Sequence, residues 1–160
     1  KYPVRNQKEP ARCRQVKLLL LRMSRDPSRG DNDPAEPVEV VLGYPDPEDY
    51  RDDPYFMGST VGRYAGRLDS GRLKLAGEVY ELDRNDSEYG HCLHGGSGGF
   101  HSKYWEVDED PNSNAVLYRM VSPDGDQGFP GRMTVTVRYS LVSRMVLQVD
   151  YFAESESETG

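Results

Sequence analysis

The chain has 160 residues, the length of one ordinary domain. Its 27 acidic residues outnumber its 20 Lys and Arg residues, and the net charge of −7 disfavours nucleic acid or an anionic membrane as the main partner. No apolar run approaches the length of a membrane span. Cys13 and Cys92 are the only two cysteines. They do not form the dense pattern of a disulfide framework, so we expect a reduced, cytoplasmic setting.

The N-terminal residues 1–14 are rich in Lys, Arg, Gln and Pro and have almost no apolar periodicity. This composition predicts a flexible basic arm. Residues 16–21 then form an apolar run bounded by polar residues, which is too short to favour a free-standing helix and predicts a strand. Residues 26–37, crowded with Asp, Pro, Gly and Asn, predict a loop, and residues 38–42 predict a second strand.

The middle of the chain contains a predicted β-hairpin. Residues 73–75 and 79–82 are strand-like and are joined by a short glycine-containing link at 76–78. Residues 115–121 predict another strand. We therefore expect this region to be built from short antiparallel segments.

The clearest periodicity lies near the C-terminus. Apolar and polar residues alternate strictly over 133–141 and again over 145–153, which predicts two strands, each with one buried face. The short link at 142–144 would make them antiparallel neighbours. Residues 154–160 are polar and acidic and predict a disordered tail. Since no segment has a helical stripe, we expect an all-β, antiparallel β-sandwich domain over residues 15–153.

Three blocks carry the functional information. Residues 62–67 read GRYAGR, residues 89–96 read YGHCLHGG, and residues 122–131 read SPDGDQGFPG. In this order and at this spacing they resemble the N-terminal half of the aldose 1-epimerase (galactose mutarotase) family. The resemblance extends over about residues 38–153.

The resemblance implies a β-sandwich of the galactose mutarotase type, of which this chain would be an incomplete, N-terminal portion. It implies a small-molecule aldose as the partner, interconversion of the α and β anomers of hexoses such as galactose and glucose, and no cofactor. In such a reaction a base deprotonates the anomeric hydroxyl and an acid protonates the ring oxygen, so that the ring opens and can close from either face.

Two residues match positions with roles in the family. Arg67 matches an arginine that binds substrate, and His94 matches a histidine that hydrogen-bonds the sugar and assists ring opening. Both residue types suit these roles, because a guanidinium keeps its charge while donating to hydroxyls and an imidazole can change charge near neutral pH. Gly66 stands where the family pattern has asparagine, so one side-chain hydrogen bond to the sugar is missing.

The family's second histidine, its sugar-binding aspartate and its glutamate base have no counterpart in these 160 residues. The sequence therefore predicts either a fragment of an epimerase or a non-catalytic relative. The alternative function is a carbohydrate-binding or interaction module, in which Arg67, His94 and nearby aromatic residues hold a sugar without converting it. These aromatic residues are Phe56, Tyr64, Phe100 and Trp105.

Two other kinds of site are weaker interpretations of the same residues. The spacing of His91, Cys92, His94 and His101 is not a recognised zinc pattern, so no metal is predicted. Residues 95–99 satisfy G-x-S-x-G, but a serine nucleophile at this turn needs a following helix and a later histidine, and His101 is the last histidine in the chain.

Overall fold

The computed structural model describes residues 11–14, 22–23, 38–39, 41–51, 53–110, 114–143, 146–157 and 159. The chain divides into two compact units, each of which we describe by itself. Unit 1 comprises Lys1–Val16 and Thr60–Gly160, and unit 2 comprises Lys17–Ser59. The strand predicted at 16–21 and the first ten residues of the predicted arm lie outside the described residues.

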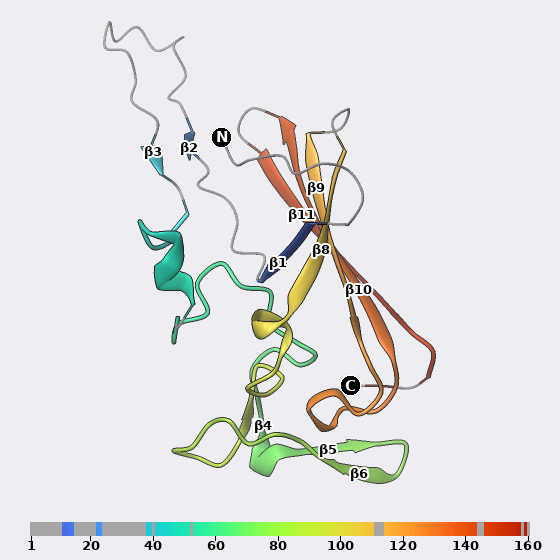
Figure 1. Ribbon diagram of the computed structural model, residues 1–160. Coiled ribbons are helices and arrows are strands. Elements are labelled where there is room, and N and C mark those ends of the chain that lie inside the picture. The colour runs from blue at the N-terminus through green and yellow to red at the C-terminus, as the bar shows by residue number, and fades with distance from the viewer. Residues whose placement is uncertain are drawn as a thin grey trace, which may run out of the picture. The chain divides into compact units, whose positions relative to one another are not determined.

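The main sheet of unit 1 has five antiparallel strands in the order β1-β8-β9-β10-β11 (Figure 1). The sequence predicted β9 at 115–121, and the alternation of apolar and polar residues predicted β10 and β11 with nearly these boundaries. The strands are β1 (Ala11–Arg14), β8 (Tyr104–Asp110), β9 (Ala115–Ser122), β10 (Met133–Ser143) and β11 (Val146–Ser155).

Strand β1 lies within the segment for which the sequence predicted a flexible arm. Its residues pair with β8, with Ala11 opposite Val107 and Arg14 opposite Tyr104. A sheet edge offers unpaired backbone groups to any nearby chain, and such pairing depends little on side-chain hydrophobicity. Composition therefore could not reveal this strand.

Among the described residues, three further pairs of short strands complete the sheet structure. In unit 1, β4 (Arg67–Leu68) pairs with β7 (Cys92–Leu93), and β5 (Arg72–Leu75) pairs with β6 (Glu78–Glu81). The β5–β6 pair is the predicted hairpin, and it turns at Ala76 and Gly77, whose φ angles of 50° and 86° are those of a tight hairpin turn. Short 3-10 turns link the strands: η3 (Asp69–Gly71), η4 (Phe100–Ser102) and η5 (Asp126–Gly128).

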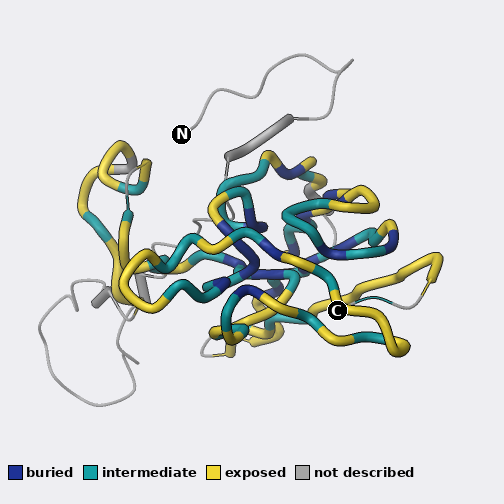
Figure 2. The backbone as a smooth tube through the Cα atoms, turned by 90° about the horizontal axis from the view of Figure 1, so that it is seen from below, coloured by how far each residue is buried: buried dark blue, intermediate teal, exposed yellow. Residues whose placement is uncertain are grey.

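One face of the main sheet forms the larger hydrophobic core. Val135 and Val137 of β10 are buried, as the alternation of that strand predicted, and Trp105 of β8 is fully buried. Tyr118 and Met120 of β9 complete the sheet's contribution, and Phe100 of η4 packs against it. In Figure 2 the buried residues of unit 1 gather at its centre, whereas the tips of its hairpins are exposed.

A second, smaller core lies among the short strands. It consists of buried Leu82, Cys92 and Phe129, with Leu68 and Leu73 packed against them. Because Leu68 and Cys92 belong to β4 and β7, this core supports the strand pair that contains two of the three sequence motifs.

Strand β11 is at one edge of the main sheet and runs further than predicted. Glu154 and Ser155, which fell in the predicted disordered tail, pair with Thr134 and Met133 of β10. Two aromatic side chains of this strand remain largely exposed, Tyr151 at 64% and Phe152 at 56%. The alternation of apolar and polar residues thus predicted the position of this strand correctly, but the predicted buried face is at most partly buried.

Unit 2 contains β2 (Arg22–Met23), β3 (Val38–Glu39) and the 3-10 turn η2 (Pro47–Tyr50). The strand predicted at 38–42 is shorter in the structure, and Leu42 beyond it is 81% exposed. The carboxylate of Asp53 accepts hydrogen bonds from the Tyr44 hydroxyl at 3.0 Å and from two backbone N–H groups, so local polar contacts hold this segment.

The part of the chain that the structure describes contains no helix of the length and apolar character needed to cross a membrane.

Candidate functional site

The pairing of β4 with β7 brings two sequence motifs together. Arg67 lies opposite Leu93, and Leu68 lies opposite Cys92. The side chain of Asn85 fixes the same strand, because its Oδ1 accepts from the Leu93 N–H at 2.7 Å and its Nδ2 donates to the Leu93 carbonyl at 2.9 Å. This pairing brings the backbones of residues 66, 67 and 94 close together.

Gly66 and His94 are joined by two hydrogen bonds. The backbone N–H of His94 donates to the carbonyl of Gly66 at 2.9 Å, and the N–H of Gly66 donates to Nδ1 of the His94 ring at 3.1 Å. An imidazole that accepts at Nδ1 carries its proton on Nε2 when neutral. The backbone of Gly66 therefore selects the neutral tautomer in which Nε2 of His94 carries the proton.

The surroundings of His94 keep its ring neutral. Burial lowers the pKa of His94 below its usual value, and the positive charge of Arg67 lowers it further. At neutral pH the side chain is therefore an uncharged hydrogen-bond donor and does not carry the second proton of an imidazolium.

Arg67 is held by a carboxylate that sequence reasoning did not single out. Its Nε donates to Oδ2 of Asp86 at 2.7 Å, and the side chains are 54% exposed for Arg67 and 10% for Asp86. This bond raises the pKa of Arg67 and lowers the pKa of Asp86. The nineteen-residue separation of the pair in sequence gave no signal of the contact.

The glycines that follow His94 allow two backbone segments to touch. Gly95 has a φ of 85°, and a Cβ at this position would overlap the carbonyl group of Gly62. Phe100 N–H donates to that same carbonyl at 3.2 Å. Only a residue without a side chain can occupy position 95, so close packing against Gly62 explains the glycine that follows His94.

Arg63 joins the first motif to the third. Its guanidinium makes five hydrogen bonds, two to the Ser122 side chain and carbonyl at 3.0 and 3.1 Å. The others go to the carbonyls of Pro123 and Pro130 at 2.8 and 2.6 Å and to the Thr159 hydroxyl at 2.7 Å. Every donor of the side chain is engaged, which makes Arg63 a structural residue and explains why the motif at 122–131 accompanies the motif at 62–67.

The loop after β7 is anchored to the turn between β9 and β10. Gln127 Oε1 accepts from the Gly98 N–H at 2.8 Å, and the Gln127 carbonyl accepts from the Asp83 N–H at 3.1 Å. Asp83 in turn accepts from the backbone and the hydroxyl of Ser97, both at 2.7 Å. Ser97, the central residue of the G-x-S-x-G pattern, is thus a turn residue bonded to a carboxylate.

His91 resembles His94 in its local geometry but faces different groups. Its Nδ1 accepts from the Ser70 N–H at 3.1 Å, and its ring stacks on Tyr89 with centroids 5.9 Å apart. Among the residues that the structure describes, no group of three His, Cys, Asp or Glu side chains is placed to hold a metal ion.

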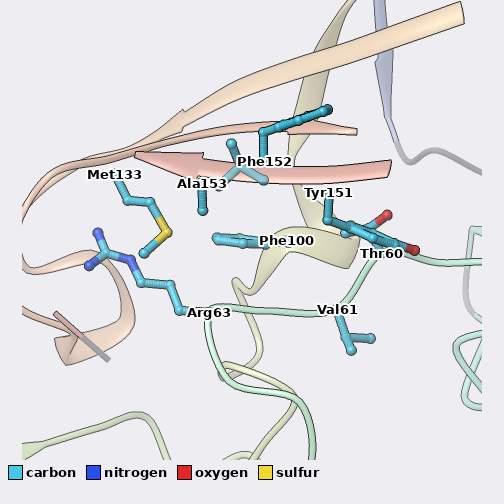
Figure 3. Close-up of a pocket in the computed structure, with 9 residues that line it drawn as sticks. Thr60, Val61, Arg63, Phe100, Met133, Tyr151, Phe152 and Ala153 are labelled. Carbon is cyan, nitrogen blue, oxygen red and sulfur yellow. The ribbon is translucent and has the colours of Figure 1, made fainter. Parts of the chain in front are cut away.

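A mostly apolar pocket of about 210 Å³ lies elsewhere in unit 1, between the β10–β11 hairpin and the segment at 60–63 (Figure 3). Phe100, Met133 and Tyr151 line it, with Arg63 at its side. Arg67, His94 and Gly66 do not line this pocket, so the residues matched to the family do not lie in it.

Comparison with known proteins gives a consistent result. The family model described as aldose 1-epimerase matches residues 30–159. The aldose 1-epimerase of Escherichia coli (strain K12) is 38% identical over 115 residues, covering 72% of this chain and 32% of that protein. The galactose mutarotase of Rattus norvegicus is 38% identical over 121 residues, covering 76% and 34%. The chain thus spans about a third of the length of these relatives.

Two solved structures are similar to the fold. An aldose epimerase homologue from C. elegans gives a TM-score of 0.68 at 27% identity and covers 77% of this chain and 37% of that one. A galactose 1-epimerase from Lactobacillus acidophilus NCFM gives 0.64 at 32% identity, covering 74% and 36%. These matches confirm the resemblance found in the sequence and the predicted all-β fold of the galactose mutarotase type.

Proposed function

This chain belongs to the aldose 1-epimerase family, and we propose that it supplies part of the sugar site of a mutarotase. The reaction is the interconversion of α and β anomers of hexoses such as galactose and glucose by acid/base ring opening. The chain would be a fragment or truncated form of such an enzyme. A cytoplasmic location belongs to the same proposal.

The observation that carries the proposal is the adjacency of Arg67 and His94. The β4–β7 pairing and the Gly66–His94 hydrogen bonds bring the backbones of Arg67 and His94 close together, although they are 27 positions apart in sequence, and the charge of Arg67 contributes to the lowered pKa of His94. Arg67 supplies a permanent positive charge with fixed donors, which suits sugar hydroxyls. His94, neutral and protonated on Nε2, supplies a donor to an oxygen whose negative charge increases as the ring opens.

In the proposed mechanism Arg67 and His94 hold the pyranose while its anomeric hydroxyl loses a proton and its ring oxygen gains one. The C1–O5 bond then breaks, the aldehyde rotates about the C1–C2 bond, and the hydroxyl at C5 adds back to the other face. The sugar gains and loses no proton overall, because a base takes one from the anomeric hydroxyl and an acid gives one to the ring oxygen, and ring closure reverses both transfers. Gly66 contributes through its backbone, where an asparagine would add a side-chain donor.

A second candidate function, sugar binding without conversion, is favoured by the carboxylates near the site. The pKa values of Asp83 and Asp86 both lie below their ordinary values, and hydrogen bonds, to Ser97 and to Arg67 respectively, are the main cause. Carboxylates of lowered pKa are weak bases and do not hold a proton near neutral pH. They are suited to structural bonding and are poorly suited to proton transfer.

Polarimetry tests the proposal. The change in optical rotation of freshly dissolved α-galactose and α-glucose would be recorded in the presence of the wild-type chain, of His94→Ala and of His91→Ala. The His91→Ala variant is the matched control. His91 lies in the same motif, and its Nδ1 also accepts a backbone N–H, but it has no assigned role. Acceleration that His94→Ala abolishes and His91→Ala retains supports catalysis by this chain.

Binding distinguishes the two functions when no acceleration occurs. Calorimetry would measure galactose binding by the chain and by the His94→Ala and Arg67→Ala variants. Binding that either substitution weakens, in a chain that does not accelerate mutarotation, supports the binding module. Binding that is unchanged in both variants contradicts the site assignment in either function.

A further inference from the structure

The backbone of Asp86 is held by a hydrogen bond at its N–H and another at its carbonyl. The Asp86 N–H donates to the His91 carbonyl at 3.1 Å, and the Asp86 carbonyl accepts from the Gly90 N–H at 2.7 Å, which closes the turn between these residues. The side chain is only 10% exposed. A short side chain on a closed turn has few positions available to it, so Asp86 is a rigid acceptor.

The Arg67 side chain is long and 54% exposed, so by itself it would sample many rotamers. Its contact with Asp86 is made through Nε at 2.7 Å. Because the guanidinium is planar, a bond at Nε orients the whole group. In the described part of the chain Arg67 donates no other side-chain hydrogen bond, and both terminal nitrogens therefore remain as donors for a ligand.

This arrangement differs from that of the other arginines near the site. Arg63 uses all five donors on protein groups, whereas Arg72 and Arg84 pair with Glu81, whose side chain is 57% exposed. Only the Arg67 pair combines a mostly buried acceptor with a mostly exposed arginine among these four. Pairs between two exposed groups contribute little and fix neither partner.

We infer that Asp86 is a positioning residue for Arg67: it holds the guanidinium by Nε so that the terminal nitrogens are preorganised to bind sugar hydroxyls. The inference rests on the proposed function for its ligand, but not for the geometry of the pair. Preorganisation increases affinity because the ordering of the arginine side chain is completed before the sugar binds.

The geometry is tested by NMR of the Arg67 Nε–H group, without any sugar. A group bonded to Asp86 gives a resolved signal that exchanges slowly with water. We expect this signal in the wild-type chain, its loss in Asp86→Ala, and its retention with a changed shift in Asp86→Asn, whose side-chain carbonyl still accepts. Glu81→Gln is the control and should leave the signal unchanged. Fast exchange in the wild-type chain, or no effect of Asp86→Ala, overturns the inference.

The role is tested by galactose affinity in a double-mutant cycle of Asp86→Ala and Arg67→Ala. We expect Asp86→Ala alone to weaken binding by about tenfold, and to have no further effect when Arg67 is already alanine. An effect that persists without Arg67 overturns the positioning role, and so does unchanged affinity in Asp86→Ala. A wild-type chain that binds no galactose contradicts the proposed function instead, and the NMR result then decides the geometry alone.

Discussion

Gly66 and His94 hold each other through two hydrogen bonds, one from the His94 backbone to the Gly66 carbonyl at 2.9 Å and one from the Gly66 backbone to the His94 ring at 3.1 Å. The second bond leaves Nδ1 as an acceptor and Nε2 as the protonated nitrogen. Gly66, which departs from the family pattern, thus orients His94, which matches that pattern.

Substitutions at Gly66 test how much its backbone conformation contributes to stability. Its φ of 108° is unfavourable for any side chain, although a Cβ there would meet only the Tyr64 ring, at 3.9 Å. We expect Gly66→Ala to lower the free energy of unfolding by about 1–2 kcal/mol, and Gly66→Asn by less, since asparagine tolerates positive φ better. Urea denaturation measures both values.

The same pair tests sugar recognition. If position 66 lies in the sugar site, Gly66→Asn should bind galactose more tightly than Gly66→Ala, because only asparagine adds a donor. Equal affinities in the two variants would place position 66 outside the sugar contacts.

The lowered pKa of His94 makes stability depend on pH. The unfolded chain binds a proton near the ordinary value of 6.5, whereas the folded chain binds it only at lower pH. The contribution of His94 is therefore zero above about pH 7, and stability falls as the pH decreases through 6.5 toward the folded pKa. Urea midpoints between about pH 5 and 8 should show this loss in the wild-type chain and less of it in His94→Gln. An equal loss in the variant would assign the effect to another group.

Arg63 should contribute more to stability than a surface arginine. Its five donors are bonded to groups from three segments, and burial is the main cause of its lowered pKa. We expect Arg63→Ala to lower the free energy of unfolding by about 3 kcal/mol. Arg72→Ala, which removes an exposed pair with Glu81, should lower it by less than about 1 kcal/mol. Similar values for the two variants in urea denaturation would show that the Arg63 bonds add little.

Gly95 and Gly77 test whether space or backbone conformation makes a glycine essential. Their φ angles of 85° and 86° are nearly equal, but a Cβ at Gly77 would meet nothing within 4 Å, whereas one at Gly95 would overlap Gly62. We expect Gly77→Ala to lower the free energy of unfolding by about 1 kcal/mol and Gly95→Ala by about 3 kcal/mol or more. Thermal unfolding of both variants gives the comparison, and equal losses would mean that the backbones at 62 and 95 are further apart than described.

Much of the fold could be predicted from the sequence because local patterns determine local structure. Strict alternation over 133–141 is sufficient to identify β10, since a strand has a side-chain period of two. The hairpin at 73–82 was predicted because two strand-like segments flank a short link that contains glycine. Strand β1 was missed, because its pairing depends on a free edge of β8 and on no property of its own residues.

The strand periods and the family can be read from the residues alone, because motifs of fixed order preserve residue identity and spacing. The fold was needed to show that Asp86 holds Arg67, that the Gly66 backbone selects the His94 tautomer, and that Arg63 joins two motifs. These contacts link residues 19 to 67 positions apart. The physical reason is that a hydrogen bond needs two groups within about 3 Å, and chain separation does not encode which distant groups folding brings that close.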